Sequence, residues 1–403
     1  MSPIGRQVVI VGAGPVGLLT ALGLARQGVE VTVLDSEPEV VRSPRAAVYF
    51  HTTISILRKL GLADEAHAIG LSSTEFKMHW LETGEVMASD MRDALEPGQE
   101  YDHNLHFGQH ILAELVMRHL AKLPNTEVLG NHTVTALAQS DREARLTVDT
   151  PNGELIFAAD WVIGTDGARS TVRKLAGLPF EGRTWPDRFV ATNIEYPFLD
   201  HGFCNANMVV DPVNWAVIGR LGREPLWRLT YGEDASLDEA SILERLPERF
   251  AAILPDPSIP YRIDNFSPYR VHQRCAPSFR VGRVLLAGDA AHACNPCGGL
   301  GLTGGVIDAD ALSDTLGAVI AGHADERVLD FYAQERRRVF VEVTSPMSTN
   351  FKRLLSESDP ARRAADKAAM FAEAHRGNAD VRASSLAELI KGAAMPVSGP
   401  VAA

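Results

Sequence analysis

The first part of the chain alternates between apolar runs and a helical pattern of apolar positions. Gln7–Val11 reads QVVIV, an apolar run after one polar residue that is typical of a buried parallel strand. Val29–Leu34 reads VEVTVL, a second and partly polar run that predicts the next strand, and Gly28 precedes it where the glycine that ends a helix is expected. Between the two runs the pattern predicts a helix through Leu18, Leu19, Leu22, Leu24 and Ala25. The chain is therefore expected to begin with a β–α–β unit.

The turn between this strand and this helix carries a glycine pattern. Residues 12–17 read GAGPVG, which matches G-x-G-x-x-G, and Asp35 ends the second strand about 20 positions on. Gly12 permits the tight turn, Gly14 lets the backbone approach a pyrophosphate, and Gly17 lets helix and strand pack closely. Asp35 is expected to bind an adenosine ribose hydroxyl. In this setting the motif predicts a dinucleotide site.

A second glycine-rich segment lies late in the chain. Val284–Ala287 predicts a buried strand that ends at Gly288 and Asp289. A loop with Gly298, Gly299, Gly301, Gly304 and Gly305 follows, and a helix is expected after it through Val306, Ile307, Leu312, Leu316, Val319 and Ile320. A strand-end carboxylate before bare backbone N–H groups at a helix N-terminus suits a polar, partly anionic ligand.

A third motif lies between these two. Trp161–Gly164 predicts a short strand, and Thr165–Arg173 reads TDGARSTVR. The motifs GAGPVG, GTDGARSTVR and AGDAAH, in this order over roughly residues 5–340, resemble those of the aromatic-ring hydroxylases. These are the flavoprotein monooxygenases typified by p-hydroxybenzoate hydroxylase. The resemblance implies non-covalent FAD, reduced by NADH or NADPH as a transient co-substrate.

The resemblance also assigns roles to single residues. It implies that Asp289 binds the ribityl chain and that Asp166 and Gly167 serve both flavin and nicotinamide. Arg45 matches an arginine near the flavin phosphates or ribityl, and Gln109 a glutamine that reaches the flavin. The full predicted cofactor-binding set is Gly12, Gly14, Pro15, Val16, Gly17, Asp35, Ser36, Arg45, Gln109, Asp166, Gly167, Gly288, Asp289, Pro296, Gly299, Gly301, Leu302 and Thr303.

The late loop departs from the family pattern PPxGGQGMN. Leu300 stands in place of the glutamine and Thr303 in place of the asparagine. The glycines are intact, so flavin binding is still expected, but substrate preference does not carry over. The implied reaction hydroxylates a phenolic or N-heteroaromatic small molecule with O₂ through a flavin C4a-hydroperoxide. Epoxidation, Baeyer–Villiger oxidation or halogenation on the same scaffold, and a non-catalytic binding protein, stay as alternatives.

The predicted fold is α/β, with a Rossmann-like FAD-binding domain of the p-hydroxybenzoate hydroxylase type, an inserted antiparallel-sheet substrate domain and a helical C-terminus. Apolar and polar side chains alternate in Trp227–Tyr231, which reads WRLTY, and this pattern indicates a half-buried strand of that inserted sheet. The expected FAD-binding domain comprises residues 1–70, 106–177 and 276–340. Residues 71–105 and 178–275 form the substrate domain, and 341–403 the C-terminal helical segment and tail.

No catalytic residue is assigned from the sequence. Candidates in the substrate region are Trp215, Arg220 and Tyr231, with Arg228 and His79 beside them. For each of these side chains, packing or a surface role is the alternative.

Composition narrows the function classes. The 403 residues hold 51 acidic and 39 basic side chains, and the net charge of -12 argues against nucleic-acid or anionic-membrane partners. No apolar run approaches the roughly 18 residues of a membrane span, and no signal peptide is evident. Four cysteines suggest a reducing compartment, so a cytoplasmic monomer or homodimer is expected.

Four further patterns have structural explanations. Cys294-x-x-Cys297 lacks a second pair for a zinc site, so we expect packing residues, with a redox pair as the alternative. Residues 299–304 match G-x-G-x-x-G again but form part of the flavin loop. The histidines His103, His106 and His110 are expected to be hydrogen-bonded surface groups, so no metal is predicted. Residues 336–338, three arginines, are expected on a solvated helix face.

Overall fold

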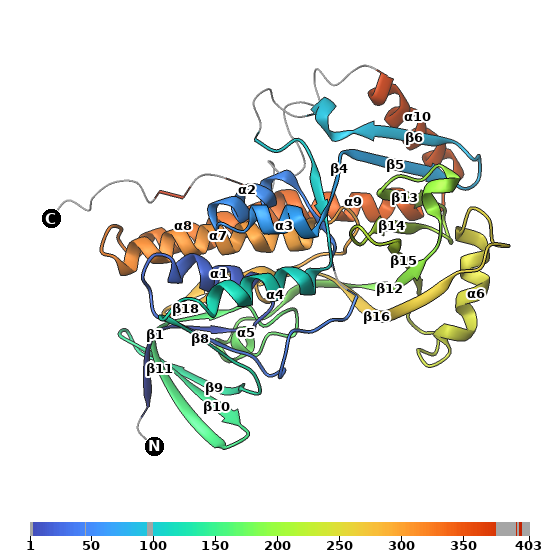
Figure 1. Cartoon of the computed structure of the whole chain (residues 1–403). Coiled ribbons are helices and arrows are strands. Elements are labelled where there is room, and N and C mark those ends of the chain that lie inside the picture. Colours follow the sequence, from blue (N-terminus) through green and yellow to red (C-terminus); the bar gives the residue numbers. More distant parts are fainter. Residues whose placement is uncertain (1–2, 45, 95–99, 376–391, 393–394, 397–403) are drawn as a thin grey trace.

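The computed structural model describes residues 3–44, 46–94, 100–375, 392 and 395–396. Two large β-sheets lie at opposite ends of the molecule, and a layer of helices covers the first of them (Figure 1). Within the described ranges, no helix combines the length and the hydrophobicity needed to cross a membrane.

The first sheet, which we call the parallel sheet, is built around the N-terminal strand. Its order is β17 (Arg280–Val281), β18 (Val284–Leu286), β11 (Gly153–Gly164), β1 (Ile4–Val11), β2 (Val31–Leu34) and β8 (Thr126–Leu129). The strands from β18 to β8 run parallel, and the strands inside the sheet are buried on both faces next to its helices, whereas the edge strand β8 is exposed or half-buried. A hairpin of β9 (Thr133–Gln139) and β10 (Ala144–Thr150) extends from β11.

The second sheet, which we call the antiparallel sheet, carries the segment predicted to cover a substrate. Its order is β19 (His292–Ala293), β16 (Arg262–Cys275), β12 (Glu181–Glu195), β15 (Leu226–Asp234), β14 (Ala216–Arg220), β13 (Ala206–Val210), β5 (Glu75–Trp80) and β6 (Val86–Asp90). Only β13 and β5 pair in parallel. The amphipathic helix α6 (Ile242–Ile253) covers one face, because its buried side chains join Trp227, Leu229 and Tyr231 in one apolar cluster.

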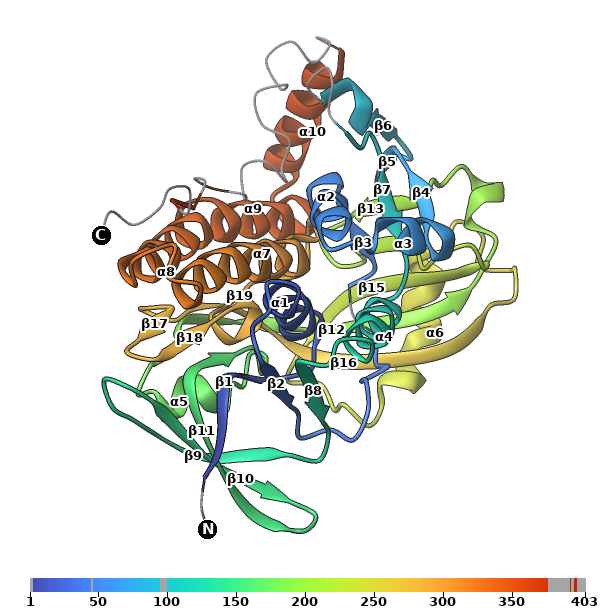
Figure 2. The same cartoon turned by 60° about the vertical axis from the view of Figure 1, so that its left-hand side comes forward.

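Helices above the parallel sheet complete the main core. Figure 2 shows α1 end-on above β1 and β2, with the helices from α7 to α9 on one side and α4 on the other. The helices α1 (Pro15–Ala25), α4 (Gln109–Leu120), α7 (Leu300–Ile320) and α8 (Arg327–Val339) contribute to this core, whereas α9 (Ser345–Ser356) packs its Leu355 with residues of the antiparallel sheet. The remaining elements are α2 (His51–Lys59), α3 (Ala63–Ile69), α5 (Thr171–Leu175), the helical turns η1 (Met91–Ala94), η2 (Phe198–His201), η3 (Gly288–Ala290) and η4 (Phe340–Thr344), and a small sheet of β3 (Val48–Tyr49), β7 (Asn104–His106) and β4 (Leu71–Ser73).

The helix after the late glycine loop begins earlier than the sequence predicts. It starts at Leu300, with Gly299 as N-cap at φ 70°, so Gly301, Gly304 and Gly305 lie inside it. Close packing requires a glycine at position 305 inside this helix, because a Cβ there would lie 2.7 Å from Cγ2 of Val16 in α1. Tertiary contact thus outweighs the low helix propensity of glycine here.

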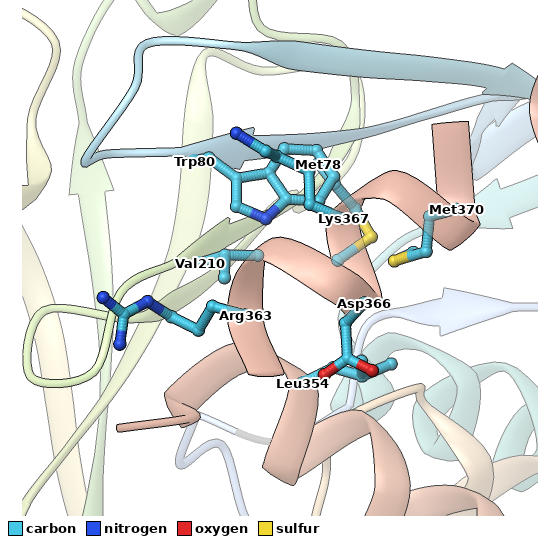
Figure 3. Close-up of a pocket in the computed structure, with 8 residues that line it drawn as sticks. All are labelled: Met78, Trp80, Val210, Leu354, Arg363, Asp366, Lys367 and Met370. Atoms are coloured by element: carbon cyan, nitrogen blue, oxygen red, sulfur yellow. The ribbon is translucent and has the colours of Figure 1, made fainter. Parts of the chain in front are cut away.

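The last described helix, α10 (Pro360–His375), packs on the hairpin of β5 and β6. Ion pairs join Arg363 to Glu82 and Lys367 to Glu85. Figure 3 shows a small cavity between α10 and β5, lined by Met78, Trp80, Val210, Leu354, Arg363, Asp366, Lys367 and Met370. No residue of the three sequence motifs lines it, so we interpret it as a packing gap.

Candidate cofactor and substrate site

The three sequence motifs leave the parallel sheet at one edge. Strand β11 pairs with β1 and with β18, and the register aligns Val11 with Gly164 and Gly164 with Leu286. Each motif begins directly after one of these strand ends. Ligands of open parallel sheets bind at the carboxyl ends of the strands, so this edge is the expected cofactor site.

The early and middle motifs are packed against each other without space for side chains. A Cβ on Gly12, whose φ is +109°, would lie 2.6 Å from the carbonyl oxygen of Thr165. A Cβ on Gly17 would lie 2.0 Å from the Gly12 oxygen. The Thr165 hydroxyl donates to the carbonyl oxygens of Val11 and Gly12, each at 2.9 Å. Glycine at positions 12 and 17 is therefore a steric requirement.

The first turn of α1 offers room for a phosphate. A Cβ on Gly14, the N-cap, would have no heavy atom within 4 Å, and Pro15 opens the helix. Asp35 lies beside this turn, since its Oδ2 accepts from the Ala13 N–H at 2.5 Å. Open space at a helix N-terminus next to a carboxylate fits the pyrophosphate and ribose of a dinucleotide. Ser36, the next residue, is exposed.

Val16 joins the early motif to the late one. A Cβ on Gly288 would lie 3.0 Å from Cγ2 of Val16, and one on Gly305 would lie 2.7 Å from the same atom. These two glycines therefore let the Gly288 turn and helix α7 close on α1. Segments almost 300 positions apart thus meet at one side chain.

Asp166 caps the short helix of the middle motif. Its carboxylate accepts from the Ser170 hydroxyl at 2.5 Å and from the N–H groups of Thr171 and Val172 at 2.6 and 3.1 Å. Burial raises the pKa of Asp166, against the effect of these hydrogen bonds. The side chain therefore holds the turn at Gly167, whose φ of +76° needs glycine.

In the late motif, Asp289 is exposed at the sheet edge while the loop after it is largely packed. Thr303 is buried, and its hydroxyl donates to the Gly299 oxygen at 3.1 Å, whereas Pro296 and Leu302 are half-buried. Asn295 holds the loop, since its N–H and its amide both donate to Oε1 of Gln273, at 3.2 and 3.1 Å.

The two loop cysteines are free thiols within the described chain, and Cys297 is fully buried. Burial raises the pKa of both Cys294 and Cys297 to about 12. Both side chains are therefore protonated and weakly nucleophilic at neutral pH.

A buried charge cluster behind the late motif is not evident from the sequence. Asp308 of α7 is fully buried and accepts from the Gly288 N–H at 2.9 Å, from Nε2 of His292 at 2.7 Å and from Nε of Arg336 at 2.7 Å. Burial would raise the pKa of Asp308, but His292 and Arg336 together hold it below its usual range. Arg336, expected on a solvated face, is buried for this reason, which corrects that expectation.

Arg173 is a second residue whose position the sequence does not reveal. Its guanidinium donates to the Ala168 and Ala290 oxygens, both at 2.9 Å, and lies 3.8 Å from the Phe180 ring centroid. This side chain therefore ties the middle motif to the residue after Asp289.

The resemblance also assigned Gln109 and Arg45 to the flavin, and the described residues include only Gln109. Gln109 is half-buried at the first position of α4, and its N–H donates to the Ala46 oxygen at 3.2 Å. Arg45 lies outside the described residues.

The predicted substrate-region residues do not gather in one place. Tyr231 is buried on the α6 face, with its ring edge-on to Phe250. His79 stacks on Phe203 inside the protein, and burial lowers its pKa. Trp215 is buried against Phe189. Arg220 donates to two carbonyl oxygens of its own turn, those of Arg223 at 2.8 Å and Glu224 at 3.3 Å.

Arg228 has the most suggestive position of the five. It alternates with the α6-facing residues of β15, so it lies on the opposite face of the antiparallel sheet, where its Nε donates to Oδ1 of Asn193 at 2.8 Å. Burial lowers its pKa to about 10. Burial also lowers the pKa of His110, the residue after Gln109, and the charge of Arg228 adds a smaller effect, so the two side chains lie within electrostatic range of each other.

Comparison with known proteins agrees with this geometry. Residues 6–346 match the family model described as an FAD binding domain. Para-nitrophenol 4-monooxygenase of Pseudomonas sp. (strain WBC-3) is 47% identical over 377 residues, which cover 93% of each chain. 6-Hydroxy-3-succinoylpyridine 3-monooxygenase of Pseudomonas putida (strain DSM 28022 / S16) is 42% identical over 356 residues, 88% of this chain and 90% of that one.

A solved structure shows the same fold over almost the whole length. The p-nitrophenol 4-monooxygenase of Pseudomonas putida DLL-E4 superposes with a TM-score of 0.92 at 46% identity, covering 97% of this chain and 99% of that one. An FAD site and a mixed α/β fold of the p-hydroxybenzoate hydroxylase type define a flavoprotein monooxygenase. The chain belongs to the family of FAD-dependent aromatic hydroxylases. Its cofactor is FAD and its substrate a small aromatic molecule, and the non-catalytic alternative is not supported.

Proposed function

We propose that this enzyme uses NADH or NADPH and O₂ to hydroxylate an acidic phenol or a hydroxylated N-heteroaromatic ring. The observation that carries the proposal is the half-buried Arg228 guanidinium, which Asn193 holds on the face of the antiparallel sheet opposite α6. The names of two relatives support the substrate class, because they are a nitrophenol and a hydroxypyridine monooxygenase.

FAD, when bound, supplies the redox chemistry, taking electrons from the nicotinamide and activating dioxygen. The chain supplies position. We assign the pyrophosphate to the Gly14 turn, the adenosine ribose to Asp35, and the ribityl chain to the exposed carboxylate of Asp289, with Gln109 reaching the flavin from α4. In this assignment the N-terminus of α7, after Gly299, directs its positive dipole end toward the electron-rich ring of the reduced flavin.

Arg228 binds the anionic oxygen of the substrate in this proposal. Removing a guanidinium from water is costly, as its lowered pKa shows, and an anion beside it offsets that cost. A pKa of about 10 keeps the side chain cationic at neutral pH. An acidic phenol, which ionises readily, gains from this charge, and ionisation raises the electron density of its ring.

The nicotinamide binds only transiently. The chain has one dinucleotide motif in a complete strand–helix–strand setting, and FAD occupies it. Arg169, exposed beside the Gly167 turn, is our candidate for contact with the nicotinamide cofactor. The absence of a second such site favours gated reduction, with slow NAD(P)H oxidation until substrate binds.

Labelled dioxygen tests the reaction. The holoenzyme, NADH or NADPH and a panel of phenols and hydroxypyridines are incubated under ¹⁸O₂, and the products are analysed by mass spectrometry. We expect faster NAD(P)H oxidation with an acidic phenol and one labelled oxygen atom in the product. Flavin turnover without label in any product would refute the monooxygenase assignment.

Substrate recognition has its own test. Arg228→Met removes a charged hydrogen bond worth about 1.5–3 kcal/mol, so KM for the best phenol should rise roughly 10- to 150-fold. Arg220→Met is the matched control, because that guanidinium bonds carbonyls of its own turn. Equal KM values in the two variants would contradict the role of Arg228.

The cellular setting is also a proposal. Four free thiols within the described chain and a net charge of -12 support a cytoplasmic monomer or homodimer. Gel filtration with light scattering measures the assembly.

A further inference from the structure

Two histidines from distant parts of the chain face each other at the protein surface. His67 of α3 and His103, just before β7, place their Nε2 atoms 2.9 Å apart. Nδ1 of His67 lies 2.7 Å from the Ala63 carbonyl oxygen, and Nδ1 of His103 lies 3.1 Å from Oδ1 of Asp102. The contact at Nδ1 therefore fixes the orientation of each ring.

The partners at Nδ1 determine the tautomer of each ring. A carbonyl oxygen only accepts hydrogen bonds, and so does the ionised carboxylate of Asp102, whose side chain is 68% exposed. Both Nδ1 atoms then carry hydrogen, and in the neutral rings both Nε2 atoms carry lone pairs. Two lone pairs at hydrogen-bonding distance repel unless a cation lies between them.

We propose that His67 and His103 bind one divalent transition-metal cation, of the zinc and copper class, through their Nε2 atoms. Two metal–nitrogen bonds of about 2.0–2.1 Å place the nitrogens about 2.9 Å apart at the right angle of a square-planar copper site and about 3.3 Å apart at the tetrahedral angle of zinc. The observed separation of 2.9 Å equals the first value, and tetrahedral zinc requires the two rings to move apart by about 0.4 Å.

The surroundings also suit a metal. Metal-ligating histidines donate their second N–H to a carboxylate or a backbone carbonyl, and these two rings have one of each. The His103 side chain is 19% exposed, which leaves access for the ion and for water at its other positions. Among the described residues, no group of three or more His, Cys, Asp or Glu forms a metal cluster, so this is a two-histidine site.

The site joins two parts of the molecule. Arg223, in the turn between β14 and β15, donates to the His67 carbonyl oxygen at 3.1 Å, and the Tyr101 ring stacks on His67. An ion at this point fixes α3 to the segment that leads through β7 to α4. It takes no part in the oxygen chemistry, so metal binding should stabilise the fold without being required for turnover.

Zinc titration of the untagged holoenzyme tests the site. We expect one more equivalent of Zn²⁺ to bind to the parent than to the double variant His67→Gln/His103→Gln, and a higher unfolding temperature with Zn²⁺ only in the parent. Asp102→Asn should lower the affinity for this additional Zn²⁺ ion about 10- to 100-fold. His119→Gln is the matched control, because His119 also contacts an acidic residue, Glu65, at the surface.

Two results would overturn the proposal. Equal Zn²⁺ stoichiometry in the parent and the double variant would show that the two rings share a proton instead of a metal. Loss of the extra equivalent in His119→Gln would place the ion elsewhere. Cu²⁺ titration followed by electron paramagnetic resonance supplies an independent readout, since nitrogen ligation of the bound ion should disappear in the double variant.

Discussion

Replacing Asp308 with Asn tests the buried charge cluster behind the late motif. The substitution keeps the shape of the side chain and removes its charge. Arg336, which donates to Asp308 at 2.7 Å and is only 2% exposed, then stays buried without that counter-charge. His292 and the Gly288 N–H also lose an ionised acceptor.

The expected loss is large because both partners are inaccessible to water. Removing one partner of a buried ion pair costs about 3–5 kcal/mol, whereas a surface pair contributes about 0–1 kcal/mol. Asp314 of the same helix forms such a surface pair with Lys59, at 2.6 Å. Asp314→Asn is therefore the matched control, with an expected loss below about 1 kcal/mol.

Urea unfolding followed by tryptophan fluorescence measures the free energy, and flavin fluorescence measures FAD release in the same samples. The native pKa of Asp308 is lowered, so its stabilisation is present above the unfolded pKa of about 3.9 and is lost as pH falls through the native value. The difference between parent and Asp308→Asn should therefore be constant near neutral pH and shrink below about pH 4.

The reasoning would be refuted if Asp308→Asn and Asp314→Asn lost equal stability. Arg336→Met in the Asp308→Asn background serves as a second check. It removes the cation that has lost the Asp308 charge, so the double variant should recover part of the loss.

Three further predictions concern the cofactor site. Asp289→Ala should weaken FAD binding about 10- to 150-fold in fluorescence titration, since a charged hydrogen bond contributes roughly 1.5–3 kcal/mol; unchanged affinity would contradict the ribityl assignment. The double Cys294→Ser/Cys297→Ser variant should keep the rates of flavin reduction and turnover within a few-fold of the parent, because burial raises the pKa of both thiols to about 12. Loss of flavin reduction in stopped-flow absorbance traces of this variant would instead support a redox pair. Gly17→Ala should lose flavin, since its Cβ would lie 2.0 Å from the Gly12 oxygen, whereas Gly5→Ala, with no atom within 4 Å, should keep it.

Local patterns predicted the elements that local forces specify. The first strand, the helix from Pro15 and the position of Asp35 follow from an apolar run, a glycine turn and a second run. The helix that opens at Gln109 follows from its apolar spacing in the same way. The family and the FAD cofactor, both confirmed by the comparisons, rested on three such motifs in order.

Features set by distant partners were not predictable. Helix α7 accommodates Gly305 in its first turns because this position packs against Val16 of α1, a contact between residues 289 positions apart. Arg336 is buried because Asp308, on another helix, lies against it. The pair of His67 and His103 joins residues 36 positions apart, which no periodicity relates.

The register of the parallel sheet has a consequence for synthesis of the chain. Strand β11 pairs with β10 along Gly153–Ala159, but on the same edge its last residues, Val162–Gly164, have no strand partner until Val284–Leu286 leaves the ribosome. About seven tenths of the chain must therefore be made before the central sheet closes. Long-range parallel pairing of this kind folds slowly and leaves a strand edge open to aggregation. Nascent chains truncated before residue 284 should depend on chaperones, and FAD added during translation should act only after that point.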